Sequence, residues 1–139
     1  KKIFPRVIFT FDPSSKKKVN FDILKEKYQL KIFNYYEKDH DMFLKIYKKC
    51  NSLIYMSLNE TIGLPIIEAN KYNLFIIAPK LEYSHQFIQP DAQFDINSES
   101  ELTSIIEKCL KTNFNYKKKK ILKIPSSSIS FADFVNKIV

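Results

Sequence analysis

The chain has 139 residues, 45% hydrophobic and 14% aromatic, so one globular domain with a buried core is expected over residues 1–139. No apolar run approaches the roughly 18 residues that a membrane-spanning helix needs, so no integral membrane protein is expected. The net charge is +8, and the two cysteines have no metal-binding or redox spacing, which is typical of a cytoplasmic protein with reduced thiols.

Apolar runs and helical periodicities alternate along the first part of the chain. Residues 6–11 predict a strand, the apolar spacing over 21–28 predicts a helix, and 30–33 predict a second strand. A second helix is expected after a cap at Asp39 or Asp41, because apolar residues follow at i, i+3, i+4 and i+7. These residues are Phe43, Ile46, Tyr47 and Cys50.

The middle of the chain predicts a β-α-β unit. Residues 53–56 and 74–78 are short apolar runs typical of buried parallel strands. Pro65 suits the first position of the helix between them, and Asn73 suits a left-handed turn at its end. In an open parallel sheet the loop before such a helix lies at the carboxyl ends of the strands, where these sheets bind ligands.

Further elements follow along the chain. We expect a short helix at 83–88, a strand at 93–96, a helix that starts with a capping box of Ser98 and Glu101, and a last helix at 130–138. The alternation predicts an α/β domain of three layers, Rossmann-like, with a parallel sheet of about five strands.

Two carboxylates and a glycine mark the loop of the β-α-β unit. Glu60 and Glu68 stand eight residues apart, and Gly63, the only glycine of the chain, lies between them. A chain that uses glycine once is expected to use it where no other residue fits. At the mouth of a helix, exposed backbone N–H groups can then meet an anion.

This segment resembles the donor-nucleotide segment of retaining glycosyltransferases with the GT-B fold, of the family-4 type. The residues that match in order and spacing are Ser57, Glu60, Gly63, Leu64, Pro65, Glu68 and Ala69. Thr61 replaces the first glycine of the family pattern, Ile62 an aromatic residue and Asn73 a later glycine. The resemblance extends weakly to the rest of the chain, which corresponds to the C-terminal, donor-binding half of a two-domain enzyme.

The resemblance implies roles for individual residues. Glu68 would accept hydrogen bonds from the ribose of a nucleoside-diphosphate sugar, and Glu60 would lie beside the transferred sugar as the catalytic carboxylate. Backbone N–H groups of Gly63 and Leu64 would cap the diphosphate. The implied donor-binding set is Glu68, Thr61, Ile62, Gly63 and Leu64. The mechanism usually needs no metal, so neither metal nor further cofactor is expected.

Parts of the family pattern are absent. The N-terminal half, which would bind a glycan or lipid-linked acceptor, is not in the chain, nor is the first strand with its phosphate-binding arginine and lysine. Without it, the five strands are expected in the order 2-1-3-4-5, with a switch point between 6–11 and 53–56. We expect the fragment to be inactive alone.

Lysine clusters offer other contacts. Lys16, Lys17 and Lys18 follow the first strand and are candidate phosphate contacts, although a solvated loop explains them better. The run 117–120 could touch an anionic membrane at the inner face, although a solvated surface again explains it better. No nucleic-acid-reading motif accompanies either cluster.

Alternatives remain at this point. A non-catalytic nucleotide-sugar-binding or interaction module could keep both glutamates without chemistry. A flavodoxin-like regulatory domain would need an acidic pocket after the first strand, where Asp12 stands alone. The segment 82–86 follows the fourth strand and is a candidate to face the ligand, with His85 expected as a partly exposed helix residue. His40 and His85 are too isolated to form a metal site.

Overall fold

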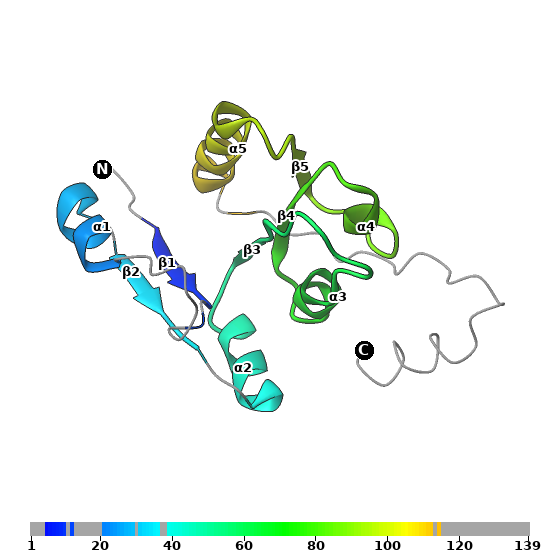
Figure 1. The fold of residues 1–139 in the computed structure, drawn as a ribbon, viewed down its shortest axis with the longest axis horizontal. Coiled ribbons are helices and arrows are strands. Elements are labelled where there is room, and N and C mark those ends of the chain that lie inside the picture. The colour runs from blue at the N-terminus through cyan, green and yellow to red at the C-terminus, as the bar shows by residue number, and fades with distance from the viewer. Residues whose placement is uncertain are drawn as a thin grey trace, which may run out of the picture. The chain divides into compact units, whose positions relative to one another are not determined.

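The computed structural model describes residues 5–10, 12, 21–29, 31–36, 39–112 and 114. It divides into two compact units, Lys1–Ile46 and Tyr47–Val139 (Figure 1). The predicted last helix at 130–138 and both lysine clusters, 16–18 and 117–120, lie outside the described residues.

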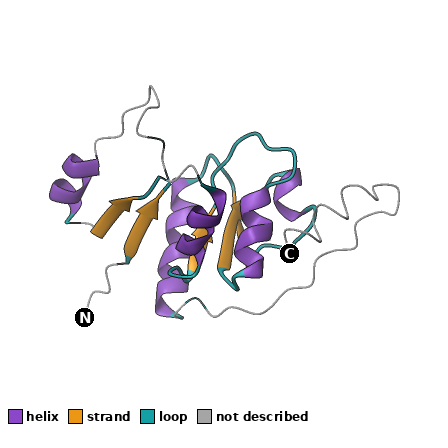
Figure 2. Ribbon diagram, turned by 90° about the horizontal axis from the view of Figure 1, so that it is seen from below, coloured by secondary structure: helices purple, strands orange, loops and turns teal. Residues whose placement is uncertain are grey.

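The first unit contains a two-stranded parallel sheet. Strand β1 (Arg6–Phe9) pairs with β2 (Lys31–Asn34), and α1 (Phe21–Tyr28) lies between them in the sequence. Figure 2 shows both strands as arrows that point the same way. The Tyr35 N–H donates to the Phe9 carbonyl at 2.7 Å and extends the ladder by one residue. The strands and the helix confirm the sequence prediction to within one or two residues.

Helix α2 (His40–Tyr47) begins at a side-chain cap. An Asp39 carboxylate oxygen accepts from the N–H groups of Asp41 and Met42, at 2.9 and 3.2 Å, so Asp39 rather than Asp41 is the capping residue. The helix ends at Tyr47, so Cys50, which the apolar spacing placed on the same helical face, lies beyond it.

The second unit is built on a three-stranded parallel sheet. Its strands are β3 (Ser52–Ile54), β4 (Phe75–Pro79) and β5 (Ala92–Phe94), in that order. The central strand is hidden on both faces, with Ile76, Ile77 and Ala78 fully buried. Burial of an isoleucine side chain contributes about 1.5–3 kcal/mol, which explains why a five-residue apolar run suffices for the core strand.

Helices cover both faces of this sheet. Figure 1 shows α3 (Leu64–Lys71) and α5 (Glu99–Lys111) on opposite sides of β4. On the α5 side, Ile77, Phe94 and Cys109 form a buried cluster. The second unit is therefore a layered α/β structure, as expected.

The end of α3 has the geometry of a Schellman motif. Asn73 adopts a left-handed conformation with φ 58°. The N–H of Asn73 donates to the Asn70 carbonyl at 3.1 Å, and that of Leu74 to the Ala69 carbonyl at 2.9 Å. This confirms the predicted role of Asn73 and turns the chain directly into β4.

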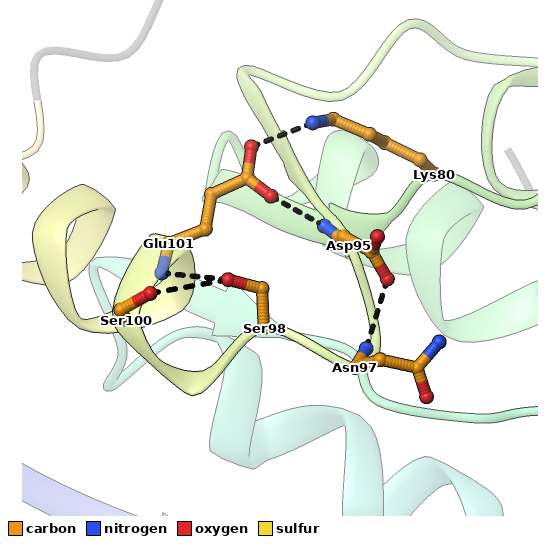
Figure 3. A network of polar contacts seen from close by, with 6 residues as sticks. All are labelled: Lys80, Asp95, Asn97, Ser98, Ser100 and Glu101. Atoms are coloured by element: carbon orange, nitrogen blue, oxygen red, sulfur yellow. Dashed lines mark hydrogen bonds and ion pairs between the residues drawn. The ribbon is translucent and has the colours of Figure 1, made fainter.

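A polar network fixes the start of α5 (Figure 3). The Ser98 hydroxyl accepts from the Glu101 N–H at 3.2 Å, as expected for a cap. The second half of the predicted capping box is wrong. Instead of the Ser98 N–H, the Glu101 carboxylate accepts from the Asp95 N–H at 2.7 Å and from the Lys80 ammonium at 2.6 Å. Glu101 thereby joins α5 to the residues that follow β4 and β5.

All strand pairs that the structure describes are parallel, which confirms the predicted type of sheet. These pairs are β1–β2, β3–β4 and β4–β5, so two sheets are present among the described residues rather than one of five strands. None of the described helices is long and apolar enough to cross a bilayer.

Candidate functional site

The loop between β3 and α3 turns at Gly63. This residue has φ 67° and ψ 47°, in the left-handed region, and stands at the N-cap of α3. A Cβ at this position would lie 3.0 Å from Cδ2 of Tyr83 and 3.4 Å from Cδ1 of Ile66. Both the backbone conformation and the Tyr83 ring therefore disfavour any residue with a Cβ, which supports the interpretation of the single glycine.

The N-terminus of α3 carries no side-chain cap. Leu64 is its first residue and Pro65 its second, one position later than the sequence predicted. The Gly63 carbonyl accepts from the Ile66 N–H at 2.9 Å. No side chain therefore caps the backbone N–H groups at this helix N-terminus, which we call the helix mouth, and such N–H groups bind anions in other proteins.

Glu68 lies inside the unit. Its side chain is only 5% exposed, and one carboxylate oxygen accepts from the Tyr47 hydroxyl at 3.1 Å. The Tyr47 ring in turn stacks on Tyr72 with a centroid separation of 5.7 Å. Burial, reinforced by the charge of Glu68, raises the pKa of the Tyr47 hydroxyl far above its ordinary value, so Tyr47 remains a donor.

The position of Glu68 corrects one expectation. With Pro65 at the first helical position, as the sequence predicted, Glu68 would lie on the first turn, where the helix dipole stabilises a carboxylate. Because α3 begins at Leu64 and has no acidic residue in its first turn, Glu68 lies in the second turn, where the dipole effect has faded. The Tyr47 hydroxyl is one partner that the structure provides instead.

Glu60 is exposed and is held by a second tyrosine. The Tyr55 hydroxyl donates to one Glu60 oxygen at 2.6 Å. The Tyr55 ring meets Tyr83 edge to face at 6.0 Å between centroids, and the Tyr83 hydroxyl donates to the Ser57 carbonyl at 2.5 Å. The pKa of the Tyr55 hydroxyl is raised by burial, then by its hydrogen bond to Glu60 and by that carboxylate's charge.

A pocket of about 330 Å³ opens beside Glu60. Its lining residues come from the loop after β3 and from α4 (Glu82–His85) with its flanks: Leu58, Asn59, Glu60, Thr61, Leu81, Glu82, Tyr83 and Gln86. Two of the predicted site residues, Glu60 and Thr61, therefore share one pocket. Tyr83 lines this pocket, and its ring also lies against Gly63.

Other predicted site residues lie outside the pocket lining. Glu68 faces Tyr47, while Ile62, Gly63 and Leu64 form the turn and the start of α3. The candidate phosphate contacts Lys16, Lys17 and Lys18 belong to residues that the structure does not describe. The site therefore has two parts, the pocket at Glu60 and the helix mouth, joined by Tyr83.

Several residues of the site were not singled out from the sequence. Tyr47 and Tyr55 hold the two glutamates. Tyr47 stands 21 residues before Glu68, and Tyr55 stands five residues before Glu60 but is not among the residues that carry the family resemblance. The segment 82–86 was expected to face the ligand, and Glu82, Tyr83 and Gln86 do line the pocket. His85 does not line it and is exposed.

Within the described part of the chain, no group of three or more His, Cys, Asp or Glu side chains could hold a metal ion. The free thiols differ in burial, with Cys109 buried and Cys50 half-buried. Burial raises the pKa of both thiols, so both are less nucleophilic at neutral pH.

A scan against models of known protein families gives no match, and a search of curated proteins gives no similar sequence.

Proposed function

We propose that the chain is the donor half of a retaining glycosyltransferase and binds a nucleoside-diphosphate sugar. The observation that supports it is the left-handed Gly63 at an uncapped helix mouth, between two glutamates that are each held by a tyrosine hydroxyl. Such a mouth suits the diphosphate, and the pocket beside Glu60 suits the sugar.

The chemistry follows from where charge develops. When the bond between the anomeric carbon and the diphosphate breaks, negative charge grows on the phosphate oxygens and positive charge on the sugar. The N–H groups at the mouth of α3 would stabilise the first, and the Glu60 carboxylate the second. The acceptor hydroxyl then attacks from the same face and its proton passes to the diphosphate. Glu68 would bind the ribose and take no part in bond breaking.

The proposal includes a larger assembly. A glycan or lipid-linked acceptor would bind to a second half of the enzyme. In that enzyme the five strands would form one sheet, with β1 beside β3, in the cytoplasm or at the inner membrane face. Pairing of β1 with β3 would bring the end of β1 beside the loop that carries Glu60.

Titration of the 139-residue chain with uridine, guanosine, adenosine and cytidine diphosphates in a calorimeter tests the proposal. Weak binding of one of them is expected, and Glu68→Gln should weaken it by roughly tenfold or more, since one charge-assisted hydrogen bond is lost. Glu107→Gln, an exposed residue of α5 that removes the same charge, is the control. Absence of binding to all four nucleotides contradicts the proposal.

A non-catalytic nucleotide-sugar-binding module is the second candidate. It is favoured by one observation, that the described lining of the pocket contains no cation to stabilise a leaving diphosphate. The two candidates differ in sugar transfer by the two-domain protein, with radiolabelled donor and a panel of acceptors. Binding without transfer or donor hydrolysis would favour the module.

A further inference from the structure

The charged side chains that line the pocket beside Glu60 have one sign. Glu60 comes from the loop after β3, and Glu82 from the first turn of α4. The remaining described lining residues are uncharged: Leu58, Asn59, Thr61, Leu81, Tyr83 and Gln86. A ligand in this pocket therefore meets two carboxylates, together with amides and hydroxyls.

No described neighbour cancels these charges. Glu60 accepts a hydrogen bond from the neutral Tyr55 hydroxyl, and Glu82 forms no ion pair with a described residue. Lys80 is close in sequence, but its ammonium lies 2.6 Å from a Glu101 oxygen (Figure 3). The negative potential of the pocket acts on Tyr83: burial raises the pKa of its hydroxyl, and the charge of Glu60 raises it further.

The pocket has the size and polarity for one sugar ring. Its volume of about 330 Å³ is at the lower end of the range for small-molecule sites, roughly 300–1,000 Å³. The amides of Asn59 and Gln86 and the Thr61 hydroxyl can each donate and accept hydrogen bonds, as sugar hydroxyls do. Tyr83 lines this space and its ring also lies against Gly63, so a sugar here would have its diphosphate near the N-terminus of α3.

We propose that this pocket holds the transferred sugar and selects sugars that carry no negative charge. This rests on the proposed function and adds the chemical class of its substrate. A uronate would bring a third negative charge beside Glu60 and Glu82, where a partly enclosed space makes repulsion stronger than in bulk water. A neutral or amino sugar meets no such repulsion.

Calorimetric comparison of matched donors on the 139-residue chain tests this. The pairs are UDP-glucose with UDP-glucuronate and GDP-mannose with GDP-mannuronate. In each pair the neutral sugar carries a hydroxymethyl group where the uronate carries a carboxylate. In the pair that binds, the neutral member is expected to bind about tenfold more tightly at low salt. Glu82→Gln should reduce this ratio at least about threefold, and so should salt, because the repulsion is screened.

The control variant is Glu107→Gln, which changes the net charge equally but lies on α5 outside the pocket lining. It should leave the ratio unchanged. Equal affinities within a binding pair, or a ratio that Glu82→Gln does not alter, overturn the charge selection while the binding itself leaves the proposed function standing. If none of the four donors binds, the charge selection is overturned, whereas the proposed function is decided separately by the titration with the four nucleoside diphosphates. Glu82 is exposed, so circular dichroism should show that its variant folds.

Discussion

The hydroxyl of Tyr47 donates a hydrogen bond to the carboxylate of Glu68 across 3.1 Å, and both side chains are buried. The two residues are 21 positions apart, at the end of α2 and in the second turn of α3. A buried carboxylate is costly unless donors surround it, so this contact is one reason that the glutamate can remain ionised inside the unit.

Replacement of Tyr47 by phenylalanine should destabilise the protein. The variant keeps the ring that stacks on Tyr72 but removes a donor to a buried carboxylate, at a cost of about 1–3 kcal/mol. Urea denaturation measures the change. Tyr72→Phe is the matched control, because no hydrogen bond of its hydroxyl is found among the described residues, and it should change stability by less than about 0.5 kcal/mol. Equal effects of the two variants would contradict the importance of the contact.

Stability should fall at alkaline pH, and Tyr47 should contribute to the fall. Its pKa in the folded protein is raised above the ordinary value of 10.0, so folding favours the protonated hydroxyl. This contribution is fully present below pH 10 and is lost as the pH rises toward the folded pKa. Denaturation midpoints measured from about pH 8 to about pH 11 should decline less steeply in Tyr47→Phe than in Tyr72→Phe. Parallel declines in the two variants would rule out this linkage.

Alanine at Gly63 should cost more than alanine at Asn73. Both positions have positive φ, 67° and 58°, but asparagine already has a Cβ, so only Gly63→Ala newly places a Cβ in the left-handed region, at a cost of about 1–2 kcal/mol. Only the Gly63 variant also brings a Cβ to 3.0 Å from the Tyr83 ring. The difference between the two free energies of unfolding contains both the backbone strain and that contact, so a difference no larger than the strain alone would show that Tyr83 moves aside at little cost.

Much of the second unit follows from local sequence. Short apolar runs predicted β4 and the two strands beside it. Asn73 marked the end of α3 and Ser98 the start of α5, because a left-handed turn and a side-chain cap each act within a few residues. Gly63 was predictable for the same reason. The tyrosine partners were not, because Tyr47 reaches Glu68 over 21 residues and Tyr83 reaches Ser57 over 26. Contacts of that separation depend on how elements pack, which hydrophobic periodicity does not encode.

The capping box illustrates the same limit. Ser98 and Glu101 have the spacing of a reciprocal cap, and the serine half is present. The glutamate instead finds Lys80, which folding brings from the end of β4. The Lys80 ammonium and the Asp95 N–H each donate to one carboxylate oxygen of Glu101 and take the place of the local partner.

The same contact makes a prediction at acid pH. The hydrogen bond to Lys80, and then the one from the Asp95 N–H, lowers the pKa of Glu101 below its ordinary 4.5. A carboxyl group whose pKa is lowered by folding stabilises the folded state at any pH above its ordinary pKa. That contribution is lost as the pH falls through the pKa of the folded state. In Lys80→Met the Glu101 pKa, followed by NMR of the side-chain carbonyl, should move upward. Because the Lys80 side chain is 55% and the Glu101 side chain 34% exposed, solvent screens the pair and stability should change little at neutral pH. An unshifted pKa would contradict the assignment.

If the proposed function holds, substitution of Glu68 and substitution of Glu60 should change different kinetic constants. In the two-domain enzyme, Glu68→Gln should mainly raise the donor KM. No charge develops on the ribose during the reaction, so its hydrogen bond to Glu68 is lost equally in the ground state and the transition state. The expected loss is one charge-assisted hydrogen bond, about 1.5–3 kcal/mol.

Glu60→Gln should instead mainly lower kcat, because a carboxylate beside the sugar interacts more strongly once positive charge develops there. Tyr55→Phe frees the Glu60 oxygen that the tyrosine holds at 2.6 Å and should lower kcat in the same direction but by less, since the charge remains. Steady-state kinetics with the donor varied at saturating acceptor distinguish these outcomes. Unchanged kinetics in both glutamate variants would refute the site, and an exchange of their effects would refute the division of roles.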